Sequence, residues 1–163
     1  MDTRLREWAP VPLRIILGFG FVFHGFPKVF TAAGHESITG MLAGIGVPAP
    51  GFAGYLVGGL EFFGGLALLL GLMVRPIAAL GAVEMLFAAL LVHLPAGFNF
   101  MNITGMTDQG PQFGMPGYEV PLLYLFGFVS LILSGPGLAS LGDRAEDIDA
   151  RVIEAEREMA GRI

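Results

Sequence analysis

Ionisable side chains occur inside stretches of this chain that are otherwise apolar. A charged group at bilayer depth costs about 2.5–3.5 kcal/mol on insertion scales, so each such residue needs a reason to be there. Carboxyl groups near a histidine or lysine can change protonation and pass protons, which makes them candidates for a proton-relay or small-ligand site. The residues concerned are Arg14, His24, Lys28, Glu61, Glu84 and His93.

Their spacing predicts that three helices turn polar faces toward one another. At 100° per residue, Arg14, His24 and Lys28 share one stripe of a helix. Glu61 and Glu84 each share a face with small residues, which let a neighbouring backbone approach closely. We therefore expect a buried cluster near the bilayer midplane, with His24, Lys28, Glu61 and Glu84 as candidate catalytic residues.

The alternative use of this cluster is structural, as a neutralised ion network that holds the helices in register. Arg14 is a candidate ligand-binding residue, and the alternative is that it snorkels to the membrane interface. Glu119 and Tyr124 begin the fourth apolar stretch and are candidate ligand-binding residues at the outer mouth of the cluster. A b-type haem would need His24 to face His93. We read His93, just before Pro95, as interfacial and predict no metal site.

The composition places the chain in a membrane. Of its 163 residues, 54% are hydrophobic and 14% are charged, against about 25% charged in a soluble domain. A soluble globule of this size cannot bury so much apolar surface. The net charge of −5 argues against a nucleic-acid partner. There is no cysteine, which excludes disulfides and thiol catalysis.

The hydropathy pattern predicts an all-α protein, a four-helix transmembrane bundle formed by residues 1–141. Spanning about 30 Å of hydrocarbon takes roughly 20 apolar residues. Lysine and arginine are absent from the loops at 31–51 and 95–117. By the positive-inside rule these loops are external and both termini cytoplasmic. The expected helices cover about 12–30, 52–74, 76–94 and 118–134.

The loops and the tail carry further expectations. Apolar residues spaced i, i+3, i+4 and i+7 after Ser37 predict a short interfacial helix. The loop at 95–117 is rich in Gly, Met and Phe, and we expect it to fold over the bundle mouth as a lid. Residues 142–163 carry seven acidic residues against four arginines and predict a short cytoplasmic helix. That helix would be a solvated extension, or a docking element for a soluble partner or a second copy.

Three motifs resemble the DoxX family of small four-helix membrane proteins. They are LRIILGFGFVFHGFPK in the first helix, the segment from Glu61 to Pro76, and GPGLASLGD after the fourth helix. The resemblance covers about residues 11–143 and leaves the tail out. It implies a bacterial inner-membrane protein connected with quinone-dependent oxidation or with redox-protective complexes. The positions that match the family pattern are Arg14, His24, Gly25, Lys28, Glu61, Gly64, Gly65, Gly71 and Arg75.

Three functions follow as hypotheses. The first is a component of a quinone-linked oxidoreductase, in which a quinone would bind beside His24, Lys28 or Glu61 and exchange protons there. The second is a non-catalytic anchor or assembly subunit that recruits a soluble redox enzyme through the tail or the external loops. The third is a small proton-coupled transporter that uses Glu61 and Glu84. Glycine-rich helix faces would also allow a homo-oligomer.

Overall fold

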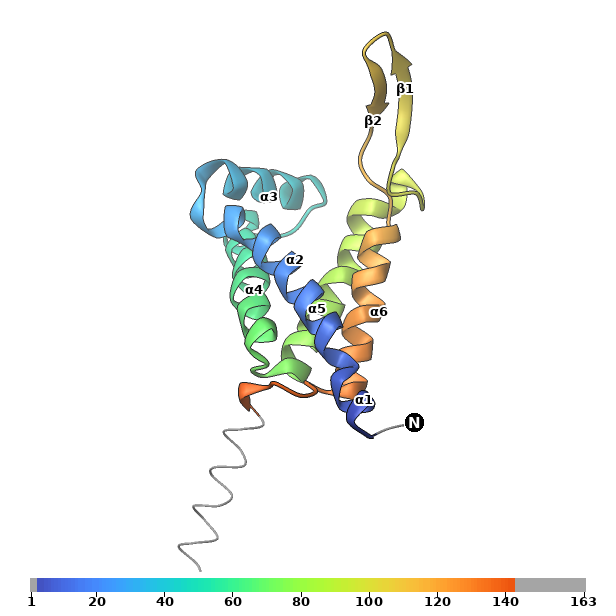
Figure 1. Cartoon of the computed structure of the whole chain (residues 1–163). Coiled ribbons are helices and arrows are strands. Elements are labelled where there is room, and N and C mark those ends of the chain that lie inside the picture. Colours follow the sequence, from blue (N-terminus) through green and yellow to red (C-terminus); the bar gives the residue numbers. More distant parts are fainter. Residues whose placement is uncertain (1–2, 143–163) are drawn as a thin grey trace, which may run out of the picture.

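The structure is a computed structural model that describes residues 3–142, and it is mostly helical (Figure 1). The chain forms a bundle of apolar helices with a small helix and a two-stranded hairpin at one end. The elements are α1 Thr3–Trp8, α2 Pro10–Phe30, α3 Ala32–Gly44, α4 Pro50–Leu70, α5 Val74–Phe87, the π-helix η1 Ala88–His93, the 3-10 helix η2 Leu94–Ala96, β1 Ile103–Thr107, β2 Gly110–Phe113 and α6 Glu119–Ser134.

Three helical segments are long and apolar enough to cross a membrane: Leu5–Phe30, Pro50–Leu70 and Val74–Ala96. The fourth, α6, is apolar but has 16 residues. Large apolar side chains cover the outside of these helices, as in Phe19, Phe23 and Leu133. Such a surface is stable against lipid rather than water, so the fold is that of an all-α membrane protein.

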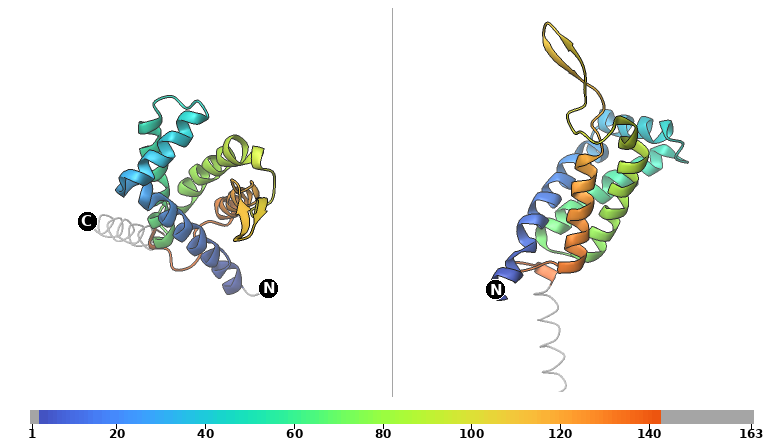
Figure 2. Two further views of the ribbon diagram at one scale, coloured as in Figure 1. Left: turned by 90° about the horizontal axis from the view of Figure 1, so that it is seen from above. Right: turned by 90° about the vertical axis from the view of Figure 1, so that its right-hand side faces the viewer.

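The helices form two close pairs. α2 packs along α4, and α5 packs along α6. In the first pair the backbones touch at glycines, since a Cβ atom at Gly65 would lie 2.7 Å from the Gly18 carbonyl oxygen. The pairs meet at one end of the bundle and separate toward the other (Figures 1 and 2).

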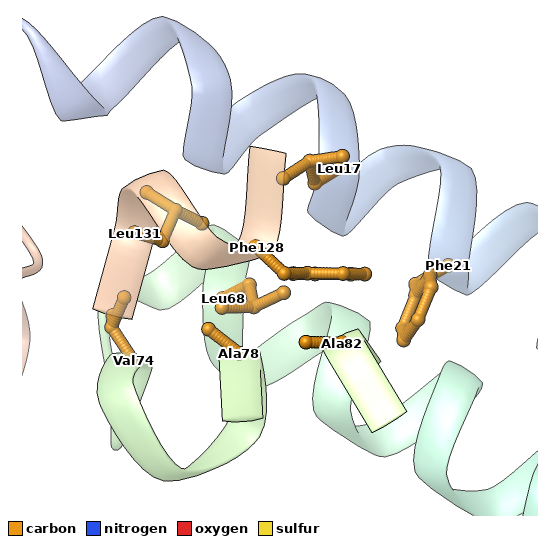
Figure 3. Packing of buried hydrophobic residues seen from close by; sticks show 8 residues of the cluster. All are labelled: Leu17, Phe21, Leu68, Val74, Ala78, Ala82, Phe128 and Leu131. Atoms are coloured by element: carbon orange, nitrogen blue, oxygen red, sulfur yellow. The ribbon is translucent and has the colours of Figure 1, made fainter. Parts of the chain in front are cut away.

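We name the two ends by their contents. The arginine end holds Arg6, Arg14 and Arg75, and the hairpin end holds α3, β1 and β2. Side chains from α2, α4, α5 and α6 form the buried apolar core in the arginine half (Figure 3). The core residues are Leu17, Phe21, Leu68, Val74, Ala78, Ala82, Phe128 and Leu131.

The turn between α4 and α5 is tighter than the sequence suggested. α4 ends at Leu70 because Gly71 adopts φ +71°, a left-handed conformation that terminates helices. Met73 also has a positive φ, and α5 starts directly after it at Val74. The second apolar stretch therefore contributes 21 helical residues rather than continuing to Val74.

The first loop contains a helix, α3, which begins earlier than expected. Thr31 rather than Ser37 is the N-cap, and its side chain accepts a hydrogen bond from the Gly34 N–H. Ile38 and Leu42 are the buried residues of this helix. The helix lies across the ends of α2 and α4 at the hairpin end (Figure 1).

The expectation that the loop at 95–117 folds back as a lid is wrong. Its central part pairs as the antiparallel strands β1 and β2, with Thr107 opposite Gly110 at the turn. Gly110 has φ +118°, which a tight reversal of this kind tolerates only at glycine. The hairpin projects away from the helices (Figure 1). Of the helix predicted over 142–163, residues 143–163 lie outside the described part of the chain.

Candidate functional site

The site is built on an ion pair between α2 and α4. Lys28 Nζ donates to both carboxylate oxygens of Glu61 at 2.5 Å. The side chain of Glu61 is 5% exposed and that of Lys28 is 21% exposed. Glycines bring the backbones together at this level, because a Cβ atom at Gly58 would lie 2.8 Å from Lys28 Cβ, and one at Gly25 would lie 2.8 Å from Glu61 Cβ.

Glu84 extends the pair into a cluster. It projects from α5 and lies close enough to interact electrostatically with Glu61 and Lys28. Within the part of the chain that the structure describes, its buried Oε2 atom has no hydrogen-bond partner. One lysine faces two carboxyl groups here, so the cluster is electrically neutral only when one carboxyl group carries a proton.

Tyr124 connects this cluster to the apolar core. Its ring stacks on Phe21 with centroids 6.2 Å apart and meets Phe128 edge-on. Its hydroxyl lies directly against Gly20, where a side chain would collide with it. The phenol is also near enough to Glu61 to interact with it electrostatically. Tyr124 therefore lies beside the cluster, and α6 contributes to the site through it.

The expectation that His24 belongs to the buried cluster is wrong. His24 lies one turn beyond Gly20 on the same side of α2, toward the hairpin end, and its side chain is exposed. Gly20 and Tyr124 bring α2 and α6 together one turn earlier. Toward the hairpin end α2 and α6 diverge (Figure 1), and the imidazole ring is exposed. Its ring contact is with the adjacent Phe23.

Arg14 does not join the cluster either, and protein groups at the arginine end hold its side chain. It is 2% exposed. Its guanidinium group donates to the carbonyl oxygens of Pro136 at 2.6 Å and Ala139 at 3.1 Å. Ser140 Oγ donates to the Gly71 carbonyl oxygen at 2.7 Å. Arg14 and Ser140 thereby hold the chain after α6 against the turn between α4 and α5.

Glu119 fixes the base of the hairpin. Its carboxylate accepts a hydrogen bond from the Phe100 N–H at 3.0 Å. His93 forms a second attachment nearby, with its Nδ1 atom 2.7 Å from the Pro116 carbonyl oxygen. Both residues hold the two ends of the hairpin loop onto η1 and α6, rather than closing the cluster.

A further polar residue, His35, lies in the helix layer above the cluster. Its ring stacks on Tyr55 at 3.7 Å, and its Nε2 atom is 3.4 Å from Thr39 Oγ1. Its Nδ1 atom is buried and has no partner among residues 3–142. The spacing of His35 with Ile38 and Leu42, at i, i+3 and i+7, could have indicated that it lies on the buried face of α3.

Comparison with known proteins supplies the family. The DoxX family model matches residues 9–94, a segment that contains Lys28, Glu61 and Glu84. An uncharacterised protein of Haemophilus influenzae is 30% identical over 133 residues, covering 81% of this chain and 87% of that protein. No solved structure matches the chain significantly. This chain is an integral membrane protein of the DoxX family.

Proposed function

We propose that this protein is the membrane component of a quinone-linked oxidoreductase, in which Lys28, Glu61 and Glu84 hold and transfer protons. The observation that carries the proposal is the buried, unpartnered Oε2 atom of Glu84 beside the Lys28–Glu61 pair. A purely structural ion network is stabilising when its buried polar atoms are all satisfied. An unsatisfied carboxyl oxygen in an apolar bundle instead favours a site that takes up a proton or a ligand.

The residues present fit a quinone head group, which is a flat ring whose two carbonyl oxygens accept hydrogen bonds. Lys28 is partly exposed and would donate to one such oxygen. Glu84, when protonated, would donate through the Oε2 atom that lacks a partner. Tyr124 offers an aromatic face at the same level. A quinone bound there would supply two-electron redox chemistry, while the chain's own groups would orient the ring and exchange its protons.

In this proposal, a soluble redox partner would deliver the electrons. The two electrons would come from a reduced donor held by that partner, and Glu84 and Lys28 would provide the two protons that balance the reduction. The partner would dock on the cytoplasmic face, through the acidic tail. A second copy of the chain could associate along glycine-rich faces of the bundle.

We also propose four membrane crossings in a bacterial cytoplasmic membrane. α6 lies antiparallel to α5 in the same bundle and would form the fourth crossing, at a length of about 24 Å. The arginine end carries Arg6, Arg14 and Arg75, which favours a cytoplasmic location for that end by the positive-inside rule. The hairpin end would then be external.

The test is quinol formation by the protein purified from native membranes together with its redox partner. General acid–base groups contribute about 10²–10⁴-fold to a rate, so Glu84→Gln should lower quinol formation by at least tenfold. Glu61→Gln should do the same. Glu36→Gln, an exposed carboxyl on α3, is the matched control and should leave the rate unchanged. Equal rates in Glu84→Gln and Glu36→Gln would refute the proposal.

A second function, as an anchor or assembly subunit, is favoured by the hairpin. Met106 and Phe113 are exposed on it, and an isolated two-stranded hairpin is marginally stable in water. A soluble enzyme that paired with β1 or β2 would bury these side chains. Under this alternative, Glu84→Gln keeps full activity in the assembled complex, whereas removal of the hairpin loses the partner.

A further inference from the structure

We propose that the Lys28–Glu61–Glu84 cluster exchanges protons with water at the hairpin end only, and that the apolar core closes the route to the arginine end. This inference rests on the proton-handling role proposed above and adds the side of the bundle at which protons are exchanged. Groups from four helices face the exchangeable proton: Lys28 from α2, Glu61 from α4, Glu84 from α5 and Tyr124 from α6.

Toward the arginine end, α2, α4, α5 and α6 all contribute apolar residues to the buried core (Figure 3). On α2, Leu17 and Phe21 are 3% and 1% exposed and separate Lys28 from Arg14, about 21 Å away along the helix. Ala78 on α5 and Phe128 on α6 are 0% exposed. A close-packed apolar layer has neither the room nor the polar partners that a chain of water molecules needs.

Toward the hairpin end, polar groups join the apolar ones. One turn beyond Gly58, which contacts Lys28, the same face of α4 presents Gly54. Ile38, His35 and Thr39 of α3 meet it there, at 3.2, 3.3 and 3.3 Å from the position of a Gly54 Cβ atom. The Nδ1 atom of His35 is buried and has no partner in the described chain, so it is a further polar atom on this side of the cluster.

The shape of the bundle agrees with this direction. The two helix pairs separate toward the hairpin end, and the hairpin projects away from the helices (Figure 1). Lys28 is the more exposed member of the ion pair and lies on the hairpin side of Gly25 in α2. Protons would therefore enter and leave past Lys28 and α3, and binding a proton would convert the Glu84 carboxylate to the acid.

The first test measures access with two matched cysteine variants. The chain has no cysteine, so a single introduced thiol reports its own surroundings. Ala88→Cys lies one turn beyond Glu84 on the hairpin side, and Ala78→Cys lies in the apolar core. In proteoliposomes of one orientation, a membrane-impermeant cationic methanethiosulfonate should label Ala88→Cys from the hairpin side alone. It should label Ala78→Cys at least tenfold more slowly from either side.

The second test follows the proton itself. The infrared carbonyl band of protonated Glu84, assigned by its loss in Glu84→Gln, should change when an impermeant buffer alters the pH at the hairpin end. The same change of pH at the arginine end should leave the band unaltered. A band that follows the arginine end, the absence of any Glu84 band, or labelling of Ala78→Cys from the arginine side overturns the inference.

Neither measurement contains quinone or a redox partner. One-sided labelling and titration without quinol formation would therefore reject the quinone-linked function and keep the direction of proton exchange. Quinol formation together with labelling from the arginine side would keep the quinone-linked function and reject the direction of proton exchange.

Discussion

Lys28 and Glu61 meet where glycines bring α2 and α4 close together, with the lysine Nζ atom 2.5 Å from both carboxylate oxygens. Gly25 and Gly58 make this approach possible, since a Cβ atom at either position would press on the other helix at the pair itself. The close packing of the two helices therefore also fixes the position of the ion pair. Substitutions of the charged residues and of the glycines test this link separately.

Removing the lysine should cost more than removing the glutamate. Lys28→Met leaves two carboxyl groups without a counter-charge, and loss of one partner of a buried pair costs about 3 kcal/mol. Glu61→Gln leaves Lys28 facing Glu84, which can replace the lost partner. We expect the free energy of unfolding, measured by circular dichroism in mixed detergent micelles, to fall more for Lys28→Met. The double variant should recover part of that loss, and strict additivity would contradict the pairing.

A methyl group in the α2–α4 contact should also destabilise the fold. Gly65→Ala would place Cβ 2.7 Å from the Gly18 carbonyl oxygen, and such overpacking costs about 2 kcal/mol. Gly40 on α3 has no atom within 4 Å of the same position. Gly40→Ala is therefore the control, and it should gain up to about 1 kcal/mol from helix propensity. Similar unfolding midpoints for both variants would rule out the close contact.

Arg14 should not tolerate replacement by lysine. The guanidinium group donates to two carbonyl oxygens at once, which one ammonium group on a flexible stem cannot reproduce. We expect Arg14→Lys to lower the free energy of unfolding by about 2 kcal/mol. Ser140→Ala, which removes one hydrogen bond to Gly71, should cost about 1 kcal/mol. A fully stable Arg14→Lys variant would instead indicate an arginine that reaches the membrane interface.

His24 should be replaceable. It is exposed, and its ring contact is with its neighbour Phe23, so His24→Gln should change the free energy of unfolding by less than about 0.5 kcal/mol. Its infrared spectrum should retain the Glu84 carboxyl band unchanged. Loss of that band in His24→Gln would place the imidazole ring back in the cluster.

The hairpin should be separable from the bundle. It is held at its base by Glu119 and His93, and its strands contact each other rather than the helices. Replacing residues 103–113 with a short Gly-Ser linker should leave the thermal unfolding of the bundle within about 0.5 kcal/mol of the parent. A large loss of stability would show that the hairpin packs on the helices as a lid.

The amino-acid sequence alone indicated the membrane environment, the family resemblance and the apolar segments, because hydropathy and the length needed to cross lipid are local properties. It also indicated that Lys28, Glu61 and Glu84 could meet, since their spacing and the small residues around them lie on predictable helix faces. The short helix over the first loop followed from the same periodicity.

Tertiary structure decided which polar residues are used together. His24 lies on the expected side of its helix, yet the divergence of α2 and α6 leaves it uncovered, and no pattern within one helix encodes an angle between two. Arg14 is buried because its acceptors follow α6, more than 120 residues away. The hairpin likewise depends on pairing between β1 and β2, whereas composition alone suggested a lid. Periodicity gives each helix its faces, but only packing determines which faces meet.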